Sequence, residues 1–141
     1  MEIKIHPNEL RLGNLVKTIF NDEICKVIAI KKQPINNGFY YTIKVDKNED
    51  YLLPEFIQPI PLTEDWLIKA EFIKNRTHPH LFRNIGKLCS LSIDYYPDNS
   101  IIELSCSGMD NEPNKIEHLK YLHQLQNLIH ALSNEELTFN K

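Results

Sequence analysis

Histidine side chains are the first groups in this sequence to test for chemistry, because an imidazole can hold a metal ion or transfer a proton near neutral pH. Two of the six histidines, His123 and His130, lie seven residues apart in the segment KYLHQLQNLIHAL. In a helix they would lie two turns apart, about 10.5 Å along the axis. One ion cannot bind both rings, since paired ligands on a helix need a spacing of three or four residues. The pair therefore predicts no metal site.

The same segment has the pattern of a two-faced helix that begins near Leu122. At about 100° per residue, its leucines and Ile129 gather on one side, and its histidines and amides gather on the other. We expect the leucines to be buried and the polar side to face either solvent or a partner. That polar side is a candidate secondary interaction face, made of His123, Gln126, Asn127 and His130.

A second histidine pair, His78 and His80, lies in the basic segment 69–87, which carries five basic residues and one acidic residue. No third metal ligand lies beside this pair in the sequence, so a surface loop is expected rather than a metal site. An exposed aromatic ring among cations can stack on bases and neutralise phosphates of single-stranded nucleic acid. The alternative is a buried Phe82 with solvated cations around it. The candidate site for a partner or nucleic acid comprises Lys74, Arg76, His78, His80, Phe82, Arg83 and Lys87.

Signatures of catalysis are missing from the sequence. The run SCSGMD, Ser105–Asp110, lacks the glycine two residues before a serine that a nucleophile elbow requires. The four glycines are isolated, so they form no phosphate-binding loop. The thiols are expected to be buried, reduced and poorly nucleophilic, and they belong to Cys25, Cys89 and Cys106. The sequence therefore predicts no enzyme, no cofactor and no metal.

Short strands are the first elements that the sequence predicts. Four apolar or alternating runs are separated by turn signals, of which Asn36–Gly38 is the clearest. They predict a small antiparallel barrel of the SH3-like kind over residues 1–62. The expected strands cover residues 15–20, 24–31, 39–45 and 55–59.

The second part of the chain, residues 63–141, predicts a helix, a sheet and another helix. Thr63 is a good N-cap for the first helix, with Trp66, Leu67, Ala70 and Ile73 as its buried stripe. Three strands should follow as an antiparallel meander packed on the C-terminal helix, over residues 89–95, 102–106 and 116–121. The predicted fold class is α+β, in one compact unit with two subdomains.

Composition narrows the class of protein. With 141 residues, 42% apolar residues and a net charge of −3, the chain is typical of a folded domain and not of a wholly basic nucleic-acid binder. The charge is segmented, because residues 94–117 carry six acidic residues and one lysine. The start of the chain lacks a signal-peptide pattern, and no apolar run approaches the length that spans a bilayer. We expect a protein without a membrane segment.

Three segments together resemble a known family. They are NELRLGNLV (Asn8–Val16), PIPLTEDWLIKAEF (Pro59–Phe72) and YLHQLQNLIHALSNEEL (Tyr121–Leu137). The family consists of small uncharacterised proteins of phages and mobile elements of Bacteroidota, with an ELRxGN start, a PIPLTExWL join and a YxHQLQNLxxAL end. The resemblance covers most of the chain and is weakest over residues 74–115.

The resemblance implies a small phage-type protein of the host bacterial cytoplasm that binds a host macromolecule. The first hypothesis is a non-enzymatic inhibitor of a host defence factor, such as an RNA-guided CRISPR effector nuclease, whose partner is a protein or a ribonucleoprotein. The second is an accessory protein that contacts RNA or DNA through the basic segment 69–87. The third is a structural or interaction protein of a mobile element.

Overall fold

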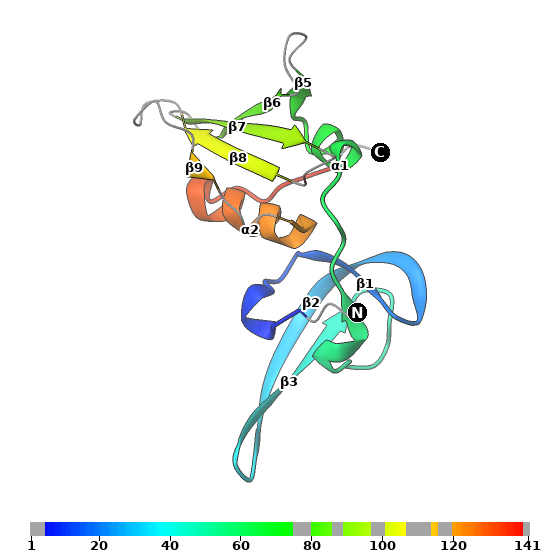
Figure 1. Cartoon of the computed structure of the whole chain (residues 1–141). Helices are drawn as coiled ribbons and strands as arrows, with labels where there is room; N and C mark the ends of the chain where they lie inside the picture. Colours follow the sequence, from blue (N-terminus) through cyan, green and yellow to red (C-terminus); the bar gives the residue numbers. More distant parts are fainter. Residues whose placement is uncertain are drawn as a thin grey trace. The chain divides into compact units, whose positions relative to one another are not determined.

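The structure is a computed structural model that describes residues 5–74, 80–85, 89–96, 101–106, 114–115 and 120–139, with side chains over 5–73 and 120–139 (Figure 1). Its fold class is α+β, as predicted. The chain divides into two compact units. Unit 1 comprises Met1–Ile60 and Tyr121–His123, and unit 2 comprises Pro61–Lys120 and Gln124–Lys141.

Unit 1 is built on a curled four-stranded antiparallel sheet with the strand order β3-β2-β1-β4. The strands are β1 (Leu15–Thr18), β2 (Asn21–Ile35), β3 (Gly38–Val45) and β4 (Ile57–Gln58). Two short 3-10 helices, η1 (Pro7–Glu9) and η2 (Pro54–Phe56), begin with proline, whose fixed φ suits a first helical position. The four strands were predicted at these places, but β2 continues four residues beyond the expected end at Lys31.

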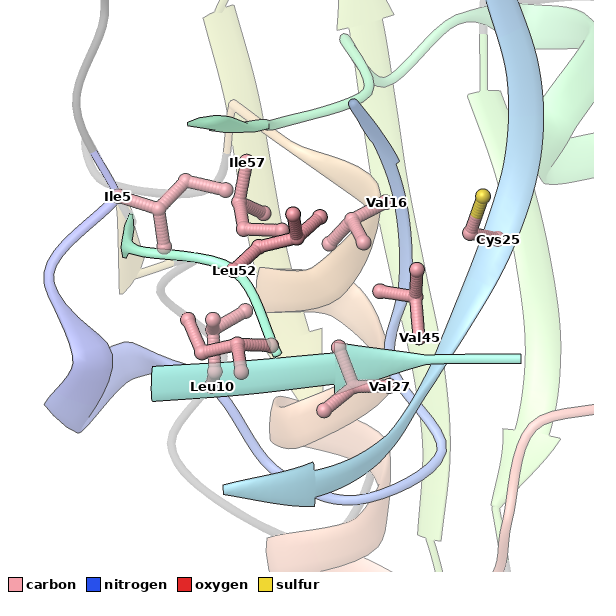
Figure 2. Close-up of a cluster of buried hydrophobic side chains, with 9 residues drawn as sticks. Ile5, Leu10, Val16, Cys25, Val27, Val45, Leu52 and Ile57 are labelled. Atoms are coloured by element: carbon pink, nitrogen blue, oxygen red, sulfur yellow. The ribbon is translucent and has the colours of Figure 1, made fainter. Parts of the chain in front are cut away.

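The core of unit 1 lies against this sheet (Figure 2). Alternation along the strands turns every second apolar residue inward, so that each strand contributes to one cluster. The cluster comprises Ile5, Leu10, Val16, Cys25, Val27, Ile43, Val45, Leu52 and Ile57. The expected burial is confirmed for the free thiol of Cys25. Burial raises the pKa of this thiol, as do Asp46 and Glu23, while Lys47 opposes them. Cys89 and Cys106 lie outside the described side chains.

A tight turn at Gly13 and Asn14 precedes β1 and is hydrogen-bonded to β2. Gly13 adopts φ 95°, a conformation that favours glycine, and its N–H donates to Val27 O at 2.8 Å. Asn14 is fully buried, its carbonyl accepts from Val27 N at 2.9 Å, and its Oδ1 accepts from Arg11 N at 2.6 Å. The Gly-Asn pair of the family-like segment Asn8–Val16 is thus explained by backbone conformation and hydrogen bonding.

Replacement of Asn14 by alanine will lower the free energy of unfolding by about 1 kcal/mol, because Arg11 N–H loses its acceptor at a half-buried position. Chemical denaturation of the full chain measures this change. Asn8→Ala is the matched control, because it makes the same change at an exposed position of the same segment. If both variants lose the same stability, the bond to Arg11 N does not account for the buried asparagine.

Unit 2 contains the predicted first helix in a shorter form, α1 (Glu64–Lys69). The Thr63 side chain caps it by accepting from Trp66 N at 3.4 Å. Leu67 and Ala70 are buried as expected. Ile73, predicted to be part of the buried stripe, is 59% exposed. The reason is that the helix stops at Ala70 and Glu71 takes φ 70°, so the helical periodicity ends before Ile73.

The sheet of unit 2 has five antiparallel strands in the order β5-β6-β7-β8-β9, instead of the three predicted. The predicted hairpin is confirmed by residue pairs that run from Leu91↔Cys106 to Tyr96↔Ile101. The predicted strand over residues 116–121 falls on residues 116–119, which lie outside the described residues, and on Lys120 and Tyr121, which belong to no strand of this sheet. The strands are β5 (Ile73–Lys74), β6 (His80–Ile85), β7 (Cys89–Tyr96), β8 (Ile101–Cys106) and β9 (Asn114–Lys115).

The C-terminal helix α2 (Leu122–Ser133) begins at the predicted residue. Leu122 N donates to Ile60 O at 2.8 Å within unit 1, and Leu62 N donates to Lys120 O at 3.0 Å within unit 2. The helix is followed by Asn134 at φ 58°, the left-handed conformation common after a helix end. Among the helices that the structure describes, none is long and apolar enough to cross a membrane.

Candidate functional site

Within the basic segment 69–87, residues 80–85 form a strand where a loop was expected, while residues 75–79 and 86–87 lie outside the described residues. His80, Phe82 and Arg83 lie in β6, and Lys74 lies in β5 beside it, paired with Leu81. Strand pairing with β5 and β7 satisfies the backbone of β6, and this tertiary pairing outweighs the polar composition on which the loop prediction rested. Arg76, His78 and Lys87 lie outside the described residues. Binding of a partner through this segment stays a prediction.

The predicted polar row on α2 is wrong for two of its four members. His123 is 0% exposed and Gln126 is 1% exposed, while Asn127 and His130 are half-buried. Leu132, expected inside, is 51% exposed. The buried side of the helix is therefore centred roughly 80° around the helix axis from the side on which the leucines gather. Gln126 falls in it because it lies one turn from Leu122.

The His123 side chain is fully buried, and Glu9 is its charged neighbour. Among the described residues, neither of its ring nitrogens has a hydrogen-bond partner. Its Nε2 lies 3.7 Å from Glu9 Oε2, which is too long for a direct hydrogen bond, and its ring stacks on Tyr121 with centroids 6.0 Å apart. Burial lowers the pKa of His123, and the Glu9 carboxylate partly opposes this shift. A buried neutral ring of this kind is a packing element and not a reachable acid, base or ligand.

Metal coordination finds no support in the part of the chain that the structure describes. There, no group of three or more histidine, cysteine, aspartate or glutamate residues is close enough to hold an ion. His123 and His130 lie two turns apart on α2, in agreement with the spacing argument.

The outer half of the β2–β3 hairpin, residues 31–41, is here named the ribbon, and its residues are exposed except for the half-buried Gln33 and Tyr41. Figure 1 shows this hairpin, in light blue and cyan, projecting beyond the other strands of unit 1. β2 and β3 pair continuously from Ala29↔Lys44 to Ile35↔Gly38. The ribbon leaves large apolar side chains in solvent, with Ile35 54%, Phe39 59% and Tyr40 37% exposed.

The ribbon is basic along β2, where both of its lysines lie. Residues 24–45 contain four lysines and no carboxylate, although the whole chain has a net charge of −3. Two of these lysines, Lys31 and Lys32, are exposed in the ribbon itself. Exposed aromatic rings next to cations without neighbouring acids are typical of surfaces that bind anionic partners.

Strand register assigns the ribbon side chains to two faces, since directly paired residues share a face. Pro34 pairs with Phe39 and Lys32 pairs with Tyr41, which defines the Phe39 face. This face continues the core side of the sheet, because alternation places Phe39 and Tyr41 in line with Ile43. Lys32 Nζ lies 4.2 Å from the centroid of the Phe39 ring, so the face presents a cation and an exposed ring together.

The other side, named the Tyr40 face, is occupied by contacts within the protein. Gln33 pairs with Tyr40 and Lys31 pairs with Thr42. The Tyr40 hydroxyl donates to Gln33 Oε1, and Lys31 Nζ lies 4.3 Å from the centroid of the Tyr51 ring. Tyr40 and Lys31 thus have partners within the protein, whereas the buried Thr42 Oγ1 has no hydrogen-bond partner among the described residues.

Two features of the sequence, besides the alternation of apolar residues, indicate the ribbon. Pro34 lies inside a strand, where a missing N–H is tolerated only at an edge or bulge. The uninterrupted stretch without carboxylates over residues 24–45 marks the same hairpin. These features together indicate a basic, two-stranded extension of the sheet.

No family model, no curated protein and no solved structure matches this chain. The functional proposal therefore rests on the ribbon and on the resemblance noted from the motifs of the sequence.

Proposed function

We propose that this chain is a non-enzymatic binding protein of the phage type that associates, in the host cytoplasm, with a host defence factor and inhibits it. The partner class is a ribonucleoprotein such as an RNA-guided effector nuclease. The observation that carries the binding role is the ribbon, which exposes Phe39 and Ile35 on a projecting, lysine-bearing hairpin. Exposed apolar side chains rimmed by charge mark interaction sites.

The ribbon has features that packing within unit 1 does not explain. A two-stranded extension is marginally stable in water, and lysines without carboxylates repel one another. Burial of Phe39 and neutralisation of Lys31 and Lys32 by an anionic partner would offset both costs. A ribonucleoprotein supplies both apolar and anionic surface, which supports this class of partner.

We also propose an SH3-like layout for unit 1. Support comes from the curl of the sheet, the short antiparallel strands and the order β3-β2-β1-β4. The bridge between Ile43 and Leu52 adds a further antiparallel pairing to β3 at the free edge of the sheet. Small barrels of this kind bind peptides and nucleic acids, so the layout agrees with a binding role by analogy of fold.

A nucleic-acid accessory role through the basic segment is the second proposal. The pairing of β5 with β6 favours it, because this pairing brings Lys74 into the strand next to Arg83. Replacing Lys74, Arg76, Arg83 and Lys87 by alanine tests this role separately from the ribbon. Unchanged nucleic-acid affinity in that variant removes the basic segment as the contact.

Reconstitution with purified RNA-guided effector nucleases of a Bacteroidota host tests the first proposal. The full chain is expected to form a stable complex with one of them and to reduce its cleavage of target DNA. Phe39→Ala should weaken both effects, whereas Ile68→Ala should not, since Ile68 is a similarly exposed side chain in α1. No complex and full cleavage with every effector would overturn the proposal.

A further inference from the structure

We infer that the Phe39 face of the ribbon binds single-stranded nucleic acid, with Phe39 stacking on an unpaired base and Lys32 neutralising a neighbouring phosphate. This inference deepens the proposed function, on which it rests for the identity of the partner, because it assigns the contact to the nucleic-acid part of the ribonucleoprotein. It also makes a prediction about isolated oligonucleotides that does not require the host factor.

The geometry of the Phe39 face suits one nucleotide. The phenyl ring is 59% exposed and carries no polar group, so its π-face can accept any base. The Lys32 ammonium lies 4.2 Å from the ring centroid. This cation lies over the ring, so a base that stacks there takes its place, and the displaced ammonium stays within reach of the sugar-phosphate of that base. This pairing of ring and cation is the arrangement that sequence-independent single-strand binders use.

Charge favours nucleic acid over a protein partner at this face. Lys32 supplies the positive charge of this face, Lys31 adds a second charge on the other face of the ribbon, and residues 24–45 contain no carboxylate, although the whole chain is acidic overall. A phosphate backbone satisfies closely spaced lysines by releasing its counterions, and this release makes binding depend on salt. An apolar protein surface would leave Lys32 without a counter-charge next to the contact.

Stacking on Phe39 requires an exposed base face, which favours a single strand over a duplex as the ligand. In a duplex the base faces are stacked on each other and cannot reach Phe39, whereas loops and single strands present them. The Tyr40 face is less suited to the same contact. Its Tyr40 ring is 37% exposed, against 59% for the Phe39 ring, and the Tyr40 hydroxyl is bonded to Gln33.

Fluorescence anisotropy with labelled oligothymidine and oligouridine of about 16 nucleotides tests the inference in the full chain at low salt. Phe39→Ala should weaken binding by roughly 5- to 150-fold, the range for losing one stacked base. Phe39→Tyr should retain affinity because the ring is kept. Phe39→Leu should lose affinity as alanine does, because it keeps apolar bulk but has no π-face.

Two lysine variants give a matched pair of equal charge. Lys32→Ala should reduce the slope of log affinity against log salt by about 0.7, the value for one phosphate contact on a single strand. Lys31→Ala removes the same charge from the Tyr40 face and should change the slope less. Thermal unfolding confirms that each variant is folded, which is expected because these side chains are exposed.

Three results would overturn the inference: no binding of either oligonucleotide, equal affinity for a duplex of the same length, or full affinity in Phe39→Leu. Its failure is distinguishable from failure of the proposed function. If Phe39→Ala abolishes inhibition of the effector while oligonucleotides do not bind, the ribbon contacts protein and only the inference falls. If oligonucleotides bind but no effector is inhibited, the inference holds and the proposed function falls.

Discussion

Replacement of Ile43 by alanine will lower the free energy of unfolding by about 2–5 kcal/mol, the largest effect that we expect from a single substitution. Ile43 is 0% exposed in the core of unit 1, and its backbone N–H and C=O both bond to Leu52 at 2.7 Å. Truncation removes apolar contacts and leaves a cavity, because strand pairing on either side limits the collapse of the site.

The matched control for Ile43→Ala is Ile35→Ala, the same chemical change in the ribbon at a side chain that is 54% exposed. This control should change stability by less than about 0.5 kcal/mol. Urea denaturation followed by far-UV circular dichroism measures both variants. Equal losses in the two variants would contradict the assignment of Ile43 to the core.

The single tryptophan gives a second signal in the same experiment. Trp66 belongs to unit 2, where its ring packs edge-on against Phe139 with centroids 5.4 Å apart. If the units unfold independently, Ile43→Ala will shift the circular dichroism transition of unit 1 and leave the Trp66 fluorescence transition in place. Coincident shifts in both signals will instead show one cooperative transition.

Acidification should destabilise the protein through His123. Burial holds the pKa of His123 below its ordinary value of 6.5 in the folded chain, whereas the unfolded chain has the ordinary value. Below about pH 6.5, the unfolded state therefore binds a proton that the folded state does not. This difference removes up to about 1.4 kcal/mol of stability per pH unit, until the pH falls to the folded pKa. Above pH 6.5 the histidine contributes no pH dependence.

Two variants isolate this contribution. His123→Phe keeps an aromatic ring beside Tyr121 but cannot titrate, so its stability should fall less than that of the natural chain between about pH 7 and about pH 5. Glu9→Gln removes the carboxylate that favours the charged ring, so its stability should fall more. Urea denaturation at each pH measures the three proteins. Parallel pH profiles for all three would show that His123 is not responsible.

Local signals predict much of this fold. The turn at Asn36–Gly38 places the β2–β3 hairpin, Thr63 starts α1, and the change of hydrophobic period at Leu122 starts α2. Each of these depends on residues within a few positions of one another, where capping and turn chemistry are strong. Their success explains why the type of a helix or strand is easier to predict than the elements that pack against it.

The wrong predictions concern which elements pack against or pair with one another. The period of α2 shows that its faces differ, but it does not show which elements cover them, and so His123 was expected in solvent. Alternation correctly aligned Phe39 with Ile43, yet nothing local shows that the other strands of the sheet end before Phe39 is reached. The strand β6 depends on pairing with β7, which composition alone does not reveal.

The backbone bonds at the join between the units have a consequence for how this chain can change in evolution. Unit 1 is interrupted after Ile60 and resumes at Tyr121, and the bond from Leu122 N to Ile60 O fixes the two ends of the interruption. The bond from Leu62 N to Lys120 O does the same from the other side. For unit 1, residues 61–120 are one long excursion of the chain whose two ends are held together, so a change in the length of this excursion adds little closure entropy to the folding of unit 1.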